Sequence, residues 1–282
     1  MPQLALLVID GTPRTARRTA HLEAVGGGGA AQVLLETLDR LCPQAVLTVL
    51  RAGDGQELPA GLALNSFNGI LWTGTDLSVC ESPDSPLIAQ HLALMRACAQ
   101  AGVPVFGSGW GMHLAVVALG GEVTRNPLRR EFPLARKIQL TQCGVTHPVF
   151  AGRTQSYDAF ALHADVIEAL PLGSLILAYN RTGGVQAVEI PLPGGSTFCG
   201  VQYLPEFDLR EMASYATLHQ DDLIDEGLFA DSGQVAAFSR RAIECQVSER
   251  ADLLVALGLD DDILRDDIRQ QDLASWLAMI HR

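Results

Sequence analysis

The feature that most constrains the fold of this chain is the alternation of short apolar runs with longer segments of helical periodicity. Leu4–Ile9 is an uninterrupted apolar run that ends at Asp10 and Gly11, which is typical of a strand buried on both faces of a parallel sheet. Similar runs lie at 45–50, 69–72 and 103–106, and helical periodicity occupies 30–41 and 85–101. Parallel strands need long crossover connections, so this half predicts an α/β sheet with helices on both faces.

After residue 120 the chain becomes richer in strand-like segments. They lie at 122–124, 136–141, 159–163, 175–178, 186–190 and 197–203, and helical patterns return at 209–226, 234–245, 249–257 and 270–281. We therefore expect one domain over residues 1–230 and a helical appendage over 231–282 packed on it. The appendage is too short to bury a core of its own.

The composition excludes several classes of function. The 282 residues are 48% hydrophobic and 18% charged, with a formal net charge of −12, which is a globular balance without the basic stripe of a nucleic-acid-binding protein. The six cysteines have no metal-site spacing, and we expect neither a metal nor a cofactor. No run reaches the roughly 18 apolar residues of a membrane span. With no charged leader at its start, the chain is expected to be cytoplasmic.

One segment, Val103–Gly121, combines a strand, a glycine-rich turn and a helix. The strand enters Gly107-Ser-Gly109-Trp-Gly111, and helical residues follow directly. A nucleophile elbow has this form, with a strained turn between small residues. The helix that starts there presents backbone N–H groups and positive potential to an anion. The pattern therefore indicates a ligand site at this turn.

This turn resembles the elbow of class I glutamine amidotransferases, G-x-C-x-G-x-Q. Gly107 and Gly111 stand in the glycine positions, but the position of the nucleophilic cysteine holds Gly109. The position of the following glutamine holds His113.

Three further segments carry the same resemblance. The sequence GVQYLPE at 200–206 is similar to the family's G-V-Q-x-H-P-E, with Glu206 kept and Leu204 in place of the catalytic histidine. Residues 162–173 resemble its S-H-x-D…L-P-x-G stretch, and 72–74 fall where an oxyanion turn follows the third strand. The match covers about residues 4–215. It implies a three-layer, flavodoxin-like sandwich with a mostly parallel central sheet, plus the C-terminal helical extension.

The resemblance implies a centre that has lost its chemistry. Hydrolysis of glutamine in this family uses a thiolate paired with a histidine that a glutamate orients. Gly109 has no side chain, Leu204 takes no proton, and the retained acid Glu206 has nothing to orient. Ser108 lies one residue early, where an elbow side chain points away from the cleft. We therefore expect no normal glutaminase activity.

Other residues are candidates for the cleft. His113 is either a substitute acid/base group or a structural histidine, and the same alternatives hold for His163. The residues expected to contact a ligand are Gly74, Gly107, Trp110, Gly111, His163 and Tyr203.

Three functions remain open. The first is a binding or regulatory protein with a cleft for a γ-glutamyl or amino-acid-like ligand. It would work beside a synthetase or a glutamine-synthetase-like partner, as family members often do. The second is an enzyme with altered chemistry in the same cleft, a hydrolase, lyase or transferase, for example one that acts on a γ-glutamyl amide. The third is a structural subunit of an amidotransferase-type complex. A homodimer is compatible with all three, whereas nucleic-acid and membrane partners are not expected.

Overall fold

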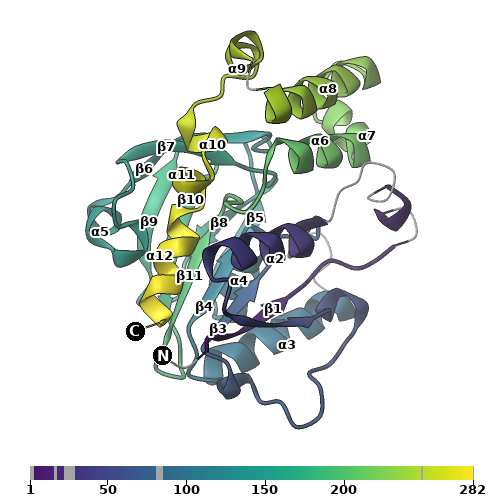
Figure 1. Ribbon diagram of the computed structural model, residues 1–282. Coiled ribbons are helices and arrows are strands. Elements are labelled where there is room, and N and C mark those ends of the chain that lie inside the picture. Colours follow the sequence, from purple (N-terminus) through teal and green to yellow (C-terminus); the bar gives the residue numbers. More distant parts are fainter. Residues whose placement is uncertain (1–2, 16–17, 22–28, 81–84, 249, 282) are drawn as a thin grey trace.

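The computed structural model describes residues 3–15, 18–21, 29–80, 85–248 and 250–281 (Figure 1). Within them a nine-stranded sheet has the order β2-β1-β3-β4-β11-β10-β9-β6-β7, and β5 and β8 form a second, two-stranded sheet. The strands are β1 Ala5–Ile9, β2 Val46–Leu50, β3 Gly69–Trp72, β4 Val105–Ser108, β5 Glu122–Arg125, β6 Leu134–Leu140, β7 Ser156–Phe160, β8 Asp165–Ala169, β9 Leu175–Asn180, β10 Gly184–Pro191 and β11 Thr197–Val201.

The large sheet has a parallel half and an antiparallel half. Strands β2, β1, β3, β4 and β11 pair in parallel, and β10, β9, β6 and β7 continue from β11 in antiparallel pairs. The antiparallel strands all come from the strand-rich part of the chain after residue 120, and β11, from the same part, joins the parallel half. In the parallel half, the carboxyl ends of the strands lie at the same edge of the sheet. Ligands of α/β proteins bind at this edge.

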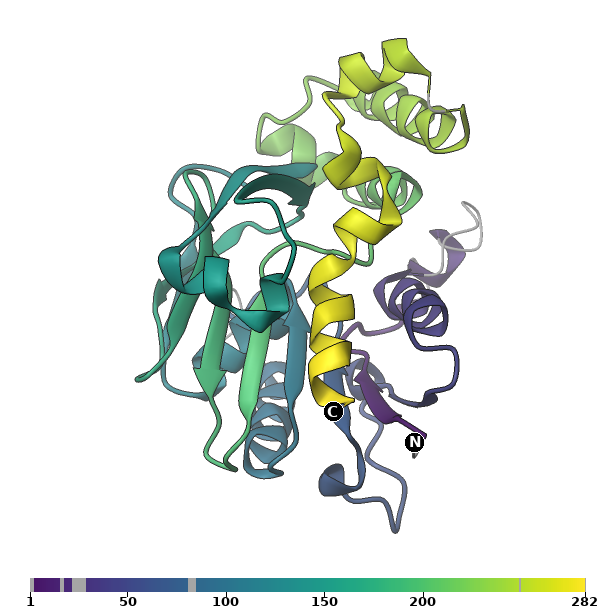
Figure 2. The same cartoon turned by 60° about the vertical axis from the view of Figure 1, so that its left-hand side comes forward.

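Helices cover both faces of the parallel half (Figures 1 and 2). The longer helices are α2 Gly29–Leu41, α3 Pro86–Gln100, α4 Trp110–Ala118, α6 Leu209–Leu218, α8 Ser232–Ser248 and α12 Gln271–Ile280. Alternate residues of β1 serve different faces, because side chains alternate along a strand. Leu7 and Ile9 belong to the core under α3 and α4, and Leu6 and Val8 to the core under α2 and α12. The predicted α/β sandwich is confirmed.

The remaining helical segments are short. They are α5 Gln142–Thr146, α7 Gln220–Asp225, α9 Ala251–Leu257, α10 Asp261–Leu264 and α11 Asp266–Arg269, with single 3-10 turns at Ala52–Asp54, Leu64–Ser66 and Pro148–Phe150. No helix in the described ranges has both the length and the apolar character needed to cross a membrane.

The C-terminal helices do not pack as one unit. Helix α8 lies against α6, whereas α12 lies along the sheet and forms part of the sandwich (Figure 2). Leu273, Trp276 and Leu277 of α12 belong to the same core as Leu6 and Val8 of β1. The end of the chain therefore stabilises the sheet that carries the site.

Candidate functional site

The turn between β4 and α4 keeps the shape of an elbow. Gly109 has φ 51° and ψ −112°, a conformation with positive φ that favours glycine, and its N–H donates to the carbonyl of Val201 at 2.8 Å. A Cβ on Gly107 would lie 2.8 Å from the Phe198 ring, and one on Gly111 would lie 2.9 Å from Trp72 Cβ. Gly107 and Gly111 therefore allow close packing of the turn against its neighbours and do not line the cleft.

Leu204 fills the space beside the elbow. A Cβ added to Gly109 would come within 3.2 Å of Leu204 Cδ2, and one added to Gly74 within 3.0 Å of the same atom. The Leu204 side chain is 4% exposed and belongs to a core cluster with Phe160 and Phe207. The place where a nucleophile and its base would meet is thus occupied by an isobutyl group.

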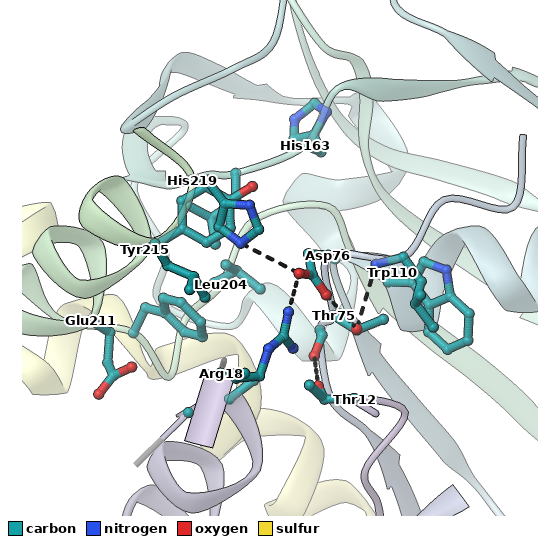
Figure 3. A pocket seen from close by; sticks show the side chains of 18 of the residues that line it. Thr12, Arg18, Thr75, Asp76, Trp110, His163, Leu204, Glu211, Tyr215 and His219 are labelled. Carbon is teal, nitrogen blue, oxygen red and sulfur yellow. Dashed lines mark hydrogen bonds and ion pairs between the residues drawn. The ribbon is translucent and has the colours of Figure 1, made fainter. Parts of the chain in front are cut away.

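A cleft of 1010 Å³ opens beside this turn (Figure 3). Six of the residues predicted for the site line it, and four do not. The six are Gly74, Gly109, Trp110, His113, His163 and Leu204. The four that lie outside are Gly107, Gly111, Tyr203 and Glu206. The volume is at the top of the range of about 300–1,000 Å³ for small-molecule sites, so the cleft is open beside Gly109 and Leu204.

Glu206 and Ser108 form a buried pair behind the turn. Ser108 Oγ donates to Glu206 Oε1 at 2.7 Å, and each residue is 2% exposed. Glu206 Oε2 has no hydrogen-bond partner among the described residues. Burial raises the pKa of Glu206 to about 7. As expected, the Ser108 side chain is directed away from the cleft, so Ser108 does not supply the missing nucleophile.

His113 is buried at the base of the cleft. Its Nε2 lies 2.6 Å from Gln202 Oε1, and the residue is 3% exposed. Burial first, and then the neighbouring charge of His163, lowers the pKa of His113 to about 4. The ring is therefore neutral at neutral pH, with one nitrogen engaged by Gln202.

His163 is held from both sides. Its Nε2 lies 2.9 Å from Glu131 Oε2, and its Nδ1 lies 2.9 Å from the backbone oxygen of Asp165. The Glu131 carboxylate also accepts hydrogen bonds from Asn180 and Gln186. Both ring nitrogens are occupied, so the observed arrangement presents His163 as a wall of the cleft with no free nitrogen for proton transfer.

Tyr203 points to the opposite side of its loop. It is fully buried, with its hydroxyl 2.9 Å from the hydroxyl of Tyr157 and hydrogen-bonded to Asp272 of α12. The structure therefore places Tyr203 at the contact with the C-terminal helix rather than against a ligand. Alternation along the chain explains this, because the next residue, Leu204, faces the cleft.

The cleft lining also carries a cluster of charged and aromatic side chains around Asp76, which the sequence did not reveal. Asp76, in the loop after β3, contacts Arg18 and also His219 at the end of α6. The His219 ring stacks on Tyr215 with 4.3 Å between centroids. All four residues line the cleft. They come from three distant parts of the chain, and Asp76 by itself reads as a turn cap.

A second pair of opposite charges in the cleft comes from β5 and β8. Arg125 Nη1 is 3.7 Å from Asp165 Oδ1, and Ser78 Oγ donates to Asp165 Oδ2 at 2.5 Å. Over the described residues, no three His, Cys, Asp or Glu side chains are grouped so that they could hold a metal ion.

Comparison with known proteins agrees with this geometry. Residues 66–219, more than half of the chain, match the model of the family described as glutamine amidotransferase class-I. The chain is 31% identical over 286 residues to a gamma-glutamyl-L-1-hydroxyisopropylamide hydrolase from a Pseudomonas species, with 98% of this chain and 93% of the relative covered.

The GMP synthases share only part of their length with this chain. A GMP synthase from Thermomicrobium roseum is 32% identical over 141 residues, which span 50% of this chain and 24% of the synthase. The structure of a glutamine amidotransferase from Thermotoga maritima superposes with a TM-score of 0.67 at 14% identity, covering 99% of both chains, and thus shares the fold. From the matched model and the full-length relative together, we conclude that this chain belongs to the class I glutamine amidotransferase family.

Proposed function

We propose that this protein binds a γ-glutamyl amide in the cleft beside Gly109 and does not hydrolyse glutamine through a thiol. The observation that carries the proposal is the coexistence of an open 1010 Å³ cleft with Leu204 packed 3.2 Å from the position of a Gly109 Cβ. A cleft that had lost all function would be free to fill with side chains. The role that fits this arrangement is binding or regulation.

The proposed ligand class rests on the charged residues that line the cleft and on the name of the full-length relative. A γ-glutamyl group carries an ammonium and a carboxylate, and Asp165 and Arg125 offer complementary charges on one side of the cleft. The relative that spans 98% of this chain is named for a γ-glutamyl amide. A cleft of this size accommodates a conjugate larger than free glutamine.

A second candidate function is hydrolysis of such an amide by different chemistry. The name of the Pseudomonas relative favours it. The reaction would add water to the γ-carbonyl carbon, break the C–N bond and release glutamate and the amine. The nucleophile would be water, because the family's cysteine position is Gly109 and Ser108 is turned away from the cleft.

A synthetase partner is also part of the proposal. GMP synthases match this chain over about a quarter of their own length, so the corresponding region in them is accompanied by further protein. We propose that the present chain acts beside a separate synthetase-like protein, with ligand binding in the cleft as the regulated event.

Binding and turnover measured on the same samples test the proposal. Thermal unfolding is recorded with glutamine, γ-glutamyl ethylamide and glutamate, and glutamate and ammonia are assayed in parallel. A midpoint that rises with ligand concentration shows binding to the folded state. Binding without products supports the first candidate, and glutamate release from the ethylamide supports the second. Ammonia release from glutamine at a rate typical of the family would overturn the proposal.

A matched pair of variants locates the binding. Leu162 lines the cleft, whereas Leu172 is 99% exposed and does not. Leu162→Trp adds bulk inside the cleft and is expected to abolish the ligand-induced shift. Leu172→Trp makes the same chemical change on the surface and is expected to leave the shift unchanged.

A further inference from the structure

The cleft holds two groups of charged side chains. One is Asp76, in the loop after β3 with Thr75, and the other is Asp165 with Arg125. Ser78, two residues after Asp76, donates to Asp165 Oδ2 at 2.5 Å, so the loop after β3 reaches both groups. An amide bound with its carbonyl at Gly109 therefore has one charged group of the cleft for each half of the molecule.

The chemistry of the two groups differs. Arg125 Nη1 lies 3.7 Å from Asp165 Oδ1, and Arg125 Nη2 lies 3.0 Å from Glu226 Oε1. This mixture of charges suits the zwitterionic end of a γ-glutamyl group. The other group centres on the Asp76 carboxylate, whose side chain is 21% exposed. The amine half of the ligand would thus lie against Asp76.

The contacts of Asp76 leave one of its oxygens underused. Arg18 Nη2 and His219 Nε2 both contact Oδ2, the latter at 3.3 Å, whereas Oδ1 accepts only a 3.3 Å hydrogen bond from Thr75 Oγ1 among the contacts of the described residues. Burial alone would raise the pKa of Asp76, but the hydrogen bond from His219 and the charge of Arg18 lower it to about 2. The group is therefore an ionised acceptor with lone pairs to spare.

Figure 3 shows how these side chains converge. In this view Arg18 approaches Asp76 from below and His219 from the upper left, and both contact Oδ2. The Arg18 guanidinium and the His219 ring hold the Asp76 carboxylate in place. A fixed, partly desolvated carboxylate discriminates strongly between ligands with and without a donor, since an unmatched polar group in such a site costs free energy.

We infer that Asp76 is a specificity-determining residue, which accepts a hydrogen bond from a hydroxyl or ammonium group on the amine half of the bound γ-glutamyl amide. The inference rests on the proposed function. It narrows the ligand class to amides of amino alcohols or diamines and excludes simple alkylamides as preferred ligands. Arg18 and His219 are positioning residues for Asp76.

A ligand series tests this without any substitution. Calorimetric titration compares γ-glutamyl propylamide, the 2-hydroxyethylamide and the 2-aminoethylamide, which are similar in size. The two donor-bearing amides are expected to bind the unmodified protein about tenfold or more tightly than the propylamide, because hydrogen bonds to charged groups are strong. The hydroxyl and ammonium arms show which donor is preferred. Equal affinities for all three would overturn the inference and leave the proposed function standing.

A substitution and its control complete the test. Asp76→Asn keeps the shape and removes the charge, and is expected to reduce the preference to about threefold or less. Asp221→Asn removes the same charge from an exposed position of α7 outside the cleft and is expected to keep the preference. A preference that survives in Asp76→Asn overturns the inference. Failure of all three amides to bind the unmodified protein overturns the proposed function and the inference with it.

Discussion

Leu204 Cδ2 lies 3.2 Å from the position that a Cβ on Gly109 would take. That distance is tighter than about nine in ten Cβ contacts, so a side chain at Gly109 would require Leu204 to move by a few tenths of an ångström. The two positions are in contact, and the effect of a substitution at one is therefore expected to depend on the residue at the other.

The first prediction concerns the introduction of a cysteine and a histidine at the two motif positions. Gly109→Cys alone is expected to release no ammonia from glutamine, because no base accompanies the thiol, and to lower the free energy of unfolding by about 1–3 kcal/mol through its positive φ. Gly109→Cys with Leu204→His removes the contact and places an imidazole in the motif position next to Glu206. The double variant is expected to release ammonia above background. The measurement is an ammonia assay beside denaturant unfolding of each variant.

Leu204→His alone is the control for that experiment, since it introduces the base without the nucleophile. It is expected to be inactive. Equal activity in the unmodified protein and the double variant would contradict the view that a cysteine at position 109 and a histidine at position 204 give this cleft glutaminase activity.

The second prediction is a pH dependence of stability from Glu206. Its pKa is raised by burial from 4.5 to about 7 in the folded protein, so the folded state holds a proton that the unfolded state releases. The contribution of this proton to the free energy of unfolding is therefore fully present below pH 4.5 and is lost as the pH rises through about 7. The loss amounts to about 3 kcal/mol for a group this deeply buried.

Glu206→Gln removes this titration. Urea unfolding between pH 5 and pH 8 is expected to show that the free energy of unfolding of Glu206→Gln rises relative to that of the unmodified protein as the pH rises. Glu168→Gln, at an exposed position of β8, controls for the loss of an acidic side chain. If the two proteins differ in free energy of unfolding by the same amount at every pH in this range, Glu206 keeps its ordinary pKa.

The third prediction concerns the contact between the loop and the C-terminal helix. Tyr203→Phe removes the hydroxyl that donates to the fully buried Asp272, whose other oxygen lies 3.5 Å from Arg153 Nη1. Leaving this carboxylate without its donor is expected to cost about 1–3 kcal/mol of unfolding free energy. The measurement is urea unfolding at 25 °C.

Tyr157→Phe is the matched comparison. It removes the other hydroxyl of the 2.9 Å Tyr157–Tyr203 pair but leaves the hydrogen bond to Asp272, so its cost is expected to be smaller. Because Tyr203 lies outside the cleft, neither variant is expected to change ligand affinity at temperatures where both are folded. A larger loss of unfolding free energy in Tyr157→Phe than in Tyr203→Phe would contradict the assignment of Tyr203 as the donor to Asp272.

Local sequence patterns were sufficient for much of the fold. Strand β1 was predicted at 4–9 and β3 at 69–72 because each is a continuous apolar run, and the helix at 85–101 was predicted from its apolar spacing. Strand β8, Asp165–Ala169, was missed because it is short and carries Asp165 and Glu168. Its pairing with β5 is a tertiary event, which a five-residue pattern does not specify.

The sequence by itself determined the family and the fold class, because motif order and apolar periodicity are properties of neighbouring residues, and it placed Gly109 and Leu204 at two motif positions. Only the tertiary structure decided that Tyr203 faces Asp272, that Ser108 pairs with Glu206, and that Arg18 and His219 meet at Asp76. Those contacts join residues between 58 and 143 positions apart. The physical reason is that side-chain direction and the convergence of distant loops depend on how the whole chain packs, and no local pattern encodes them.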